Sequence, residues 1–406
     1  MSNIQNTREP ILRFPEFNGM WSETKFSSFL DPELRAVPKP EGKYLALGIR
    51  SHGRGVFQKP NSDPKKIAMD TLYTVRENDL VVNSTFAWEG AIAIAKHEDD
   101  GGLVSHRFPT YVFNRDHAIH EFFEYIIENR RFRHKLDLIS PGGAGRNRVL
   151  SKPAFLKLEH PIPSVSEQSK IAAFLGAVDG KIGELEGKRS LLEKYKRGCM
   201  HQLFSQRLRF KDASGSEYPS WEETSIGDVG HFYYGKSAPK FSLSPDAPTP
   251  CVRYGELYST YDIIIDEVMS KTNIDPSQLK FSKGGEILVP RVGENPLDFA
   301  TCCYLPHEGI AIGEMISVFN TEENPIFYTY YFRNLQREFA RVVEGGNVSN
   351  LYYSYLEPIR IGKPHPEEQK KIADFLTAID AKIRLVSKEL KHAQTFKKGL
   401  LQQMFL

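Results

Sequence analysis

Two stretches of the chain decide its fold: EQSKIAAFL at residues 167–175 and EQKKIADFL at residues 368–376. They lie 201 positions apart, and 15 of the 39 residues aligned at this offset over 167–205 are identical. Two unrelated helices would share only a preference for helix-forming residues, and this preference does not explain so many identical positions. We therefore interpret the two stretches as copies of one element.

The segments around these stretches repeat more faintly, at matching places. The pairs are LRF at 12–14 and 208–210, Trp21 and Trp221, YVFN at 111–114 and SVFN at 317–320, FFEYIIEN at 122–129 and FYTYYFRN at 327–334, Gly142-Gly143 and Gly345-Gly346, and Pro163 and Pro364. The chain is thus an internal repeat with pseudo-twofold character, in which each copy is a globular segment followed by a long helix.

Four parts follow from this repeat. We predict a globular domain at residues 1–160, a helical spacer at 161–206, a second globular domain at 207–360 and a second helical spacer at 361–406. The globular segments have diverged while the helices have not. This asymmetry suggests that the helices share one task and that the globular domains perform two different ones.

Apolar residues follow each helix at alternating steps of three and four, which is the spacing of a heptad seam. The seam residues are Ile171, Leu175, Val178, Ile182 and Leu185 in the first helix, and Ile372, Leu376, Ile379, Ile383, Val386 and Leu390 in the second. A helix of about 36 residues is ~54 Å long, more than one such domain can cover. We expect the two seams to bury each other; the alternative is that each helix packs on its own domain.

The globular segments are mixed and rich in strands. β-Branched runs bounded by Gly, Pro or Asp predict strands, and they occur at DLVVNS (79–84), AIAIAK (91–96), GEILVPRV (285–292) and CCYLPHEGIAIGEMISVF (302–319). The regions near 117–135 and 325–341 are predicted to be helical. The fold class is therefore α+β, with two strand-rich domains and two long helices.

Composition excludes several classes of protein. Of the 406 residues, 40% are hydrophobic and 26% charged, which is typical of globular proteins. We find no apolar run near the ~20 residues of a membrane helix and no secretory signal, so we expect a cytoplasmic protein. The four cysteines form no CxxC pair, and the net charge of +2 implies that any nucleic-acid contact comes from local patches.

Three segments resemble motifs of nucleotide-binding or methyltransferase sites, but each lacks a residue or a neighbouring element that the motif requires. GHFYYGKS at 230–237 has the spacing of a phosphate-binding loop, but prolines follow it where the required helix would begin. GGAGRNR at 142–148 lacks the third glycine of a dinucleotide fingerprint, and ENPL at 294–297 lacks the second proline and the aromatic residue of a methyltransferase loop. We therefore predict no catalytic residue, no metal and no cofactor on this chain.

Basic, amide and aromatic residues gather at glycine-rich turns in both globular segments. Arg and Asn can donate paired hydrogen bonds to base edges, and glycine lets a backbone approach closely. Each cluster alone is more typical of an ordinary solvated turn, but recurrence at matching places favours a nucleic-acid surface. The candidates are Arg50, His52, Arg54, Arg131, Arg146, Asn147 and Arg148 in the first segment, and Lys236, Lys240, Arg253, Tyr258, Arg291, Asn347 and Asn350 in the second.

The chain resembles the DNA-specificity subunits of type I restriction–modification enzymes over essentially its full length. The resemblance rests on the paired EQ-x-K-I-A-x-F-L helices and on the proline-rich approach to each, HPIP at 160–163 and KPHP at 363–366. It also rests on the order of domain, helix, domain and helix, and on the acidic strand starts at Asn78-Asp79-Leu80 and Gly285-Glu286-Ile287.

The resemblance implies a function for each part. Each globular domain would recognise one half of a split target in double-stranded DNA, and the helices would form an antiparallel coiled coil that sets the unread spacer. The same helices would dock two modification (methyltransferase) subunits, with ATP-driven restriction subunits joining them. S-adenosylmethionine, ATP and Mg²⁺ would belong to those partners, and no membrane would be involved.

Two functions of other classes remain as alternatives. The chain could be a free-standing DNA methyltransferase or nuclease with an unrecognised site, or a coiled-coil scaffold that does not bind DNA. Activity of the purified chain with S-adenosylmethionine would reveal the first. Duplex binding that weakens with salt would exclude the second.

One difference separates the two helices. The first carries Gly176, Gly180, Gly183 and Gly187, where the second has Thr377, Ala381, Arg384 and Lys388. One hypothesis is that packing elsewhere simply tolerates these glycines. The other is that the bare stripe lets another backbone approach, either the second helix or a modification subunit.

Overall fold

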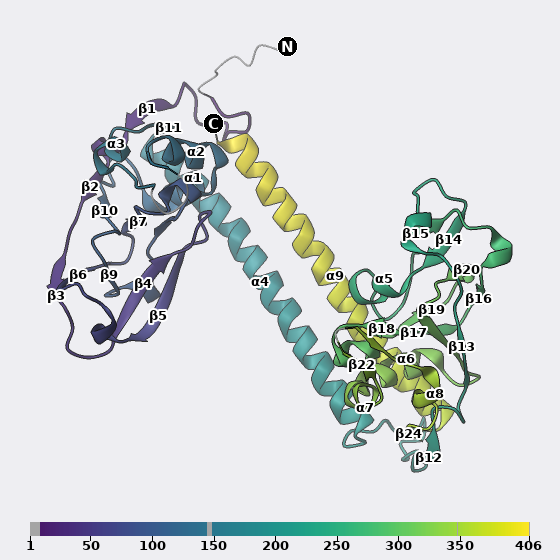
Figure 1. The fold of residues 1–406 in the computed structure, drawn as a ribbon. Helices are drawn as coiled ribbons and strands as arrows, with labels where there is room; N and C mark the ends of the chain where they lie inside the picture. Colours follow the sequence, from purple (N-terminus) through teal and green to yellow (C-terminus); the bar gives the residue numbers. More distant parts are fainter. Residues whose placement is uncertain (1–8, 144–147, 347, 406) are drawn as a thin grey trace. The chain divides into compact units, whose positions relative to one another are not determined.

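The computed structural model describes residues 9–143, 148–346 and 348–405, and the chain divides into two compact units. The first unit contains residues 1–186 together with 388–406, and the second contains residues 187–387. The two long helices are α4 (Val165–Phe204) and α9 (Pro366–Met404). Both unit boundaries fall inside these helices, so each unit contains part of α4 and part of α9 (Figure 1).

Within the described residues, the first unit is built on three sheets. They are β1 (Ser22–Lys25) with β11 (Glu159–Ile162); β2 (Leu30–Pro32), β10 (Thr110–Phe113), β7 (Leu80–Val82) and β8 (Ile92–Ile94); and β3 (Ala36–Pro38), β6 (Thr71–Thr74), β9 (Leu103–Val104), β4 (Tyr44–Ile49) and β5 (Val56–Ser62), in spatial order. Three short helices pack with them: α1 (His120–Glu128), α2 (Arg130–Leu138) and α3 (Lys152–Leu156).

The second unit has four sheets in the part of the chain that the structure describes. They are β12 (Glu222–Ser225) with β24 (Arg360–Lys363); β13 (His231–Tyr234), β21 (Ile316–Asn320), β17 (Glu286–Pro290) and β19 (Cys303–Leu305); β15 (Ser270–Thr272), β14 (Thr249–Val252), β20 (Glu308–Ile312) and β16 (Phe281–Lys283); and β18 (Val292–Gly293), β23 (Ser349–Asn350) and β22 (Glu344–Gly345). Its helices are α5 (Tyr254–Ser259), α6 (Pro325–Asn334), α7 (Gln336–Arg341) and α8 (Tyr353–Leu356).

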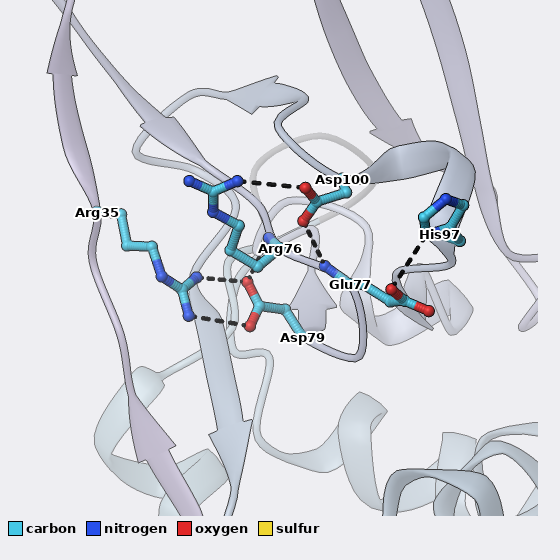
Figure 2. Close-up of polar contacts among 6 residues, drawn as sticks. All are labelled: Arg35, Arg76, Glu77, Asp79, His97 and Asp100. Atoms are coloured by element: carbon cyan, nitrogen blue, oxygen red, sulfur yellow. Dashed lines mark hydrogen bonds and ion pairs between the residues drawn. The ribbon is translucent and has the colours of Figure 1, made fainter.

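The acidic strand starts fix local turns in both units. Figure 2 shows the Asp79 carboxylate accepting hydrogen bonds from the Arg35 guanidinium, at 2.5 and 3.2 Å, and the Arg76 amide also donates to it, at 2.8 Å. Burial raises the pKa of Asp79, while these donors act against that shift. Glu286 is likewise buried, at the first position of β17, and accepts from the Lys283 amide. The repeated acid is therefore a structural residue.

The ends of both long helices lie in the cores of the units. In the first unit, the core contains Ile171 and Leu175 from the start of α4 and Phe405, which follows the end of α9. In the second unit, it contains Ile372, Leu376 and Ile379 from the start of α9, and Leu203 and Phe204 from the end of α4. The alternative that each helix packs on its own domain therefore holds at the helix starts.

The middle of the helices behaves as a coiled coil, as predicted. In the first unit, Lys397 Nζ lies 2.9 Å from the Asp179 carboxylate, and Gln394 donates a hydrogen bond of 3.4 Å to Glu186. Residues further along α4 therefore contact residues that come earlier in α9. This order makes the pair antiparallel. Seam residues of this middle part are buried (Leu185, Val386 and Leu390) or half-buried (Val178, Ile182 and Ile383). No helix of the described ranges is long and apolar enough to cross a membrane.

The glycine stripe does not contact the second helix. Gly176, Gly180, Gly183 and Gly187 are all exposed. Among the described residues, a Cβ added at Gly180, Gly183 or Gly187 would meet no atom within 4 Å, and one added at Gly176 would lie 3.9 Å from Tyr125 Oη. The hypothesis that the stripe admits the backbone of the second helix is therefore wrong, because this face of α4 points into open space.

Alanine at Gly180 and Gly183 is expected to stabilise the first unit, by about 0.5–1 kcal/mol for each substitution. The added methyl groups meet nothing, while the unfolded chain loses conformational freedom. Urea unfolding followed by circular dichroism measures the change. A lower free energy of unfolding for the double variant would contradict the open environment of the stripe.

Candidate nucleic-acid interface

A buried carboxylate at the start of α4 anchors the first unit to this helix. Arg13 donates two hydrogen bonds of 2.7 Å to Glu167, and Trp21 Nε1 donates a third at 3.4 Å. The side chain of Glu167 is only 2% exposed. The ion pair raises the pKa of Arg13, so the guanidinium stays charged.

The second unit repeats this anchor with equivalent residues. Arg209 donates to both oxygens of Glu368, at 3.0 and 2.7 Å, and Trp221 Nε1 donates at 3.1 Å. The side chain of Glu368 is fully buried. The repeated LRF segments, the repeated tryptophans and the repeated EQ pairs therefore meet in space, at the start of each long helix.

The glutamine of each EQ pair satisfies backbone groups of the adjoining domain. Gln168 accepts from the Ile119 amide and donates to the His117 and Pro163 carbonyls. Gln369 accepts from the Asn324 amide and donates to the Pro364 carbonyl. Both side chains are fully buried, so each holds the start of a helix to the loop before α1 or α6.

A second repeated set binds both helices to each domain. Tyr125 donates to Asp179, which pairs with Lys397 of α9. In the second unit, Tyr330 donates to Asp380 at 2.5 Å, and Lys196 of α4 pairs with the same carboxylate at 2.6 Å. Burial and the adjacent carboxylate raise the pKa of Tyr125 and of Tyr330.

These sets attach each domain to the long helices. Most of their residues lie in the repeated segments of the sequence, but this role was not predicted for them. The signal was the repeat itself, because Asp179, Lys196 and Tyr125 each recur at the equivalent place in the second copy. Polar residues that are identical in the two helices can form the same contacts in both copies, and need not simply face solvent.

The turn between β4 and β5 carries three candidate residues of the first unit. Arg50 is exposed and donates to the Val56 carbonyl at 2.7 Å. His52 has a left-handed backbone, with φ of 64°, and its amide donates to Glu89. Arg54 is exposed at the tip. The turn is therefore held by backbone bonds while its basic side chains face outward.

Arg148 is engaged within the domain. Its guanidinium donates to the Asp137 carboxylate at 2.5 Å and to the carbonyls of Asp137 and Ser140. It also lies 4.9 Å from the centre of the Trp88 ring. Most of its donors are therefore used. Arg146, Asn147 and Asn347, which were also predicted, lie outside the described residues.

His52 and Arg148 line one open depression of about 460 Å³, together with residues that the sequence-based selection had left out. The added basic and aromatic residues of this lining are Trp88, Arg130, Arg133 and His134. Arg131 instead lines an adjoining groove, of about 960 Å³, between α2 and the last turns of α9, and Arg130 and His134 line both hollows. The run Arg130-Arg131-Phe132-Arg133 was visible in the sequence, but the placement of Arg131 and Arg133 at different hollows was not.

Arg291 is the best-oriented candidate in the second unit. It lies between two tyrosine rings, with its guanidinium carbon 4.7 Å from the centre of Tyr234 and 5.9 Å from that of Tyr352. Among the described residues, its side chain donates only to the sulfur of Met315, at 3.5 Å, and Nε is buried without an acceptor. The cation is thus held in place but not neutralised.

Two further candidates lie next to Arg291. Asn350 of β23 is paired with Val292 of β18, the residue after Arg291. Tyr258 is half-buried and donates to the Val292 carbonyl at 3.2 Å, and burial raises its pKa. The backbone of Asn350 therefore lies next to the segment that carries Arg291, and Tyr258 supports that segment from within.

Lys236, Lys240 and Arg253 form a neighbouring group. Lys236 and Lys240 are exposed in the loop after β13, and Arg253 Nε donates to the Ala238 carbonyl in that loop. The Lys236 loop and Arg291 follow the ends of β13 and β17, which both pair with β21. The structure thus brings the chain segments that carry Lys236, Lys240, Arg253 and Arg291 to one end of this sheet.

The sequence of the second unit matches a known domain family. Residues 219–394 match the family model described as the type I restriction modification DNA specificity domain. The matched range of the specificity domain includes the second anchor residues, Trp221 and Glu368, and the Arg291 surface.

Relatives of known sequence carry the same name. The chain is 26% identical over 257 residues to the putative type I restriction enzyme MjaX specificity subunit of Methanocaldococcus jannaschii, covering 60% of this chain and 57% of the relative. It is 25% identical over 272 residues to the MjaVIII specificity subunit of the same organism, covering 62% of each. The chain thus matches less than two thirds of the length of these relatives. The resemblance to specificity subunits is confirmed.

Solved structures confirm the fold. The S subunit of a type I restriction–modification system from M. genitalium superposes with a TM-score of 0.60 at 16% identity, covering 98% of this chain and 99% of that one. A structure from a study of assembly and conformational transition of the type I system gives 0.55 at 15% identity, covering 95% and 97%. The predicted α+β fold, with two strand-rich domains and two long helices, is therefore correct.

Proposed function

We propose that the chain is the DNA-recognition subunit of a type I restriction–modification complex and that it reads a bipartite target, one half-site with each unit. The match of residues 219–394 to a DNA specificity domain carries this proposal. The first unit supports it, because it repeats the same carboxylate anchor and the same tyrosine–aspartate–lysine set.

The chain would perform no chemistry by itself. Its partners would be double-stranded DNA, two modification subunits that hold S-adenosylmethionine, and restriction subunits that use ATP and Mg²⁺. The exposed faces of α4 and α9 are the proposed docking surface for the modification subunits, since most polar positions of these helices face outward.

Exchange of the first domain tests the two-reader proposal. Residues 1–160 are replaced by the equivalent segment of another specificity subunit, and methylation by the complete complex is mapped on genomic DNA. We expect one half of the methylated motif to change and the other to persist. Simultaneous loss of both half-sites in a folded chimera would contradict the proposal.

The anchors set a condition on this exchange. The donor segment has to supply an arginine, a tryptophan and a tyrosine equivalent to Arg13, Trp21 and Tyr125, because Glu167 and Asp179 stay in the recipient. A donor without them is a control for misfolding. The reciprocal exchange of residues 207–360 should change only the other half-site.

Arg291→Ala is expected to weaken specific binding by about 1–3 kcal/mol if the guanidinium reads a base. Arg148→Ala provides the comparison, since that guanidinium already pairs with Asp137 and two carbonyls and should affect DNA affinity less. Fluorescence anisotropy with the methylated motif and with a scrambled duplex measures both. A larger effect at Arg148 than at Arg291 would reverse this assignment.

The two rival functions are tested with the same preparation. Transfer of a methyl group by the purified chain alone would indicate a free-standing methyltransferase. An absence of duplex binding at low salt would indicate a scaffold. We expect neither result. We expect the affinity for duplex DNA to fall as the salt concentration rises, because binding releases counterions from the DNA and this release is less favourable at higher salt.

A further inference from the structure

The outward face of the β4–β5 ribbon in the first unit has a distinct composition. The strands pair antiparallel, with Gly48 opposite Phe57 and Ala46 opposite Lys59 (Figure 1). Alternate residues of a strand face opposite sides. Leu47 and Ile49 are buried in the core, so the other side presents Gly48 with Phe57 and the cations beside them.

One aromatic ring organises this outward face. Phe57 lies directly over Gly48, where a Cβ would come within 2.3 Å of the ring. The Arg50 guanidinium carbon is 5.4 Å from the centre of this ring and the Lys59 ammonium is 5.1 Å from it. Both cations are exposed. Only glycine at position 48 leaves room for the ring that both cations share.

These contacts orient the cations without neutralising them. Within the described ranges, the Arg50 side chain bonds only the Val56 carbonyl, and Lys59 forms no ion pair. A ring attracts a cation through its quadrupole and leaves the net charge in place. Arg35, by contrast, is neutralised by the buried Asp79 carboxylate. The uncompensated charge on the ribbon is therefore available to an anionic partner.

The surrounding sequence is strongly basic. Residues 43–66 contain six lysines and arginines and one acid, Asp63, in a chain whose net charge is only +2. Asp63 is itself engaged, since its carboxylate accepts from the Lys65 amide. Of these cations, Arg50, Arg54 and Lys59 belong to the ribbon and its turn, and a local excess of positive charge of this kind matches a polyanion more readily than a protein surface of mixed charge.

We propose that this face of the β4–β5 ribbon is the surface through which the first unit contacts duplex DNA, with Arg50 and Lys59 bound to backbone phosphates. The inference rests on the proposed function and adds to it a specific element and two contact residues, of which Lys59 was not among the candidates from sequence. A two-stranded ribbon fits the major groove, and phosphate contacts would fix its register there.

A different explanation of the same residues is protection of a sheet edge. β5 is the last strand of its sheet, and lysine and proline on such a strand, here Lys59 and Pro60, prevent pairing with another chain. Under this explanation, removing the charge would promote self-association and leave DNA affinity unchanged. The two explanations therefore differ in a measurable outcome.

The test compares two double variants of the full chain. Arg50→Gln with Lys59→Gln removes both ribbon cations, and Lys152→Gln with Lys157→Gln removes two exposed lysines at α3 of the same unit. Binding to a fluorescent 30-base-pair duplex of mixed sequence is measured over a salt series, and sedimentation reports the oligomeric state.

We expect the ribbon variant to bind at least about tenfold more weakly than the parent chain, with a salt slope smaller by about 1.8, and the α3 variant to bind almost as the parent does. Equal affinities for the two variants, or self-association of the ribbon variant at unchanged DNA affinity, would overturn the inference. No binding by the parent chain would overturn the proposed function as well, so the two failures are distinguishable.

Discussion

Replacement of Glu368 by alanine is expected to lower the free energy of unfolding of the second unit by about 1.5–3 kcal/mol, because the half-buried Arg209 loses a fully buried, charged hydrogen-bond partner. The Arg209 guanidinium loses both of its carboxylate bonds and the Trp221 indole loses its acceptor. Urea unfolding followed by tryptophan fluorescence measures the loss, since Trp221 lies in the anchor.

Matched variants separate the anchor from general effects of a lost carboxylate. Glu223→Ala removes an exposed acid of β12 and should change stability by less than about 0.5 kcal/mol. Glu167→Ala should destabilise the first unit to a similar extent as Glu368→Ala destabilises the second. If Glu368→Ala unfolds at the same urea concentration as Glu223→Ala, the anchor does not hold the domain to its helix.

Replacement of Phe405 by alanine is expected to destabilise the first unit by about 3–5 kcal/mol, the cost of removing a large ring from a core. The ring is 7% exposed and lies 5.3 Å from Phe122 and 6.3 Å from Trp21, measured between ring centres. Thermal unfolding of the full chain, followed by fluorescence of Trp21, measures the change.

The same helix supplies the control for this prediction. Phe396 of α9 is 55% exposed, so Phe396→Ala should cost less than about 0.5 kcal/mol. The second unit supplies a parallel case, since Phe204 stacks on Tyr331 with ring centres 4.9 Å apart. Equal stability of the Phe405 and Phe396 variants would show that the aromatic contacts contribute nothing.

The repeat in the sequence predicted the two long helices and the burial of their seams against each other, because an apolar seam of constant period over so many turns has few other uses. The antiparallel direction of the pair was implied only by the family resemblance. It did not show where the seam changes partner. Ile171 of α4 and Ile372 of α9 belong to the heptad seams of their helices, yet their side chains lie in the cores of the units and not in the coiled coil. Periodicity specifies which face of a helix is apolar and not what covers that face.

The candidate surface could be predicted only in part. Basic clusters were visible, but whether an arginine is free depends on neighbours that the sequence does not place beside it. Arg148 is paired with Asp137 and packs on Trp88, while Arg291 is held by Tyr234 and Tyr352. The role of Phe57 was hidden for the same reason, since it depends on cross-strand register with Gly48.

The division of the chain into units has a consequence for its synthesis on the ribosome. The second unit is a single continuous segment, residues 187–387, and all of it has been made before the last part of the first unit is translated. The first unit needs residues 388–406, which follow at about 5–20 residues per second.

Until then, the first domain lacks Leu400, Met404 and Phe405, and the core residues that they cover remain open to water. The N-terminal domain is therefore completed last, against the usual order in which domains fold as they emerge. A nascent chain stalled before residue 388 would present this open apolar surface to chaperones.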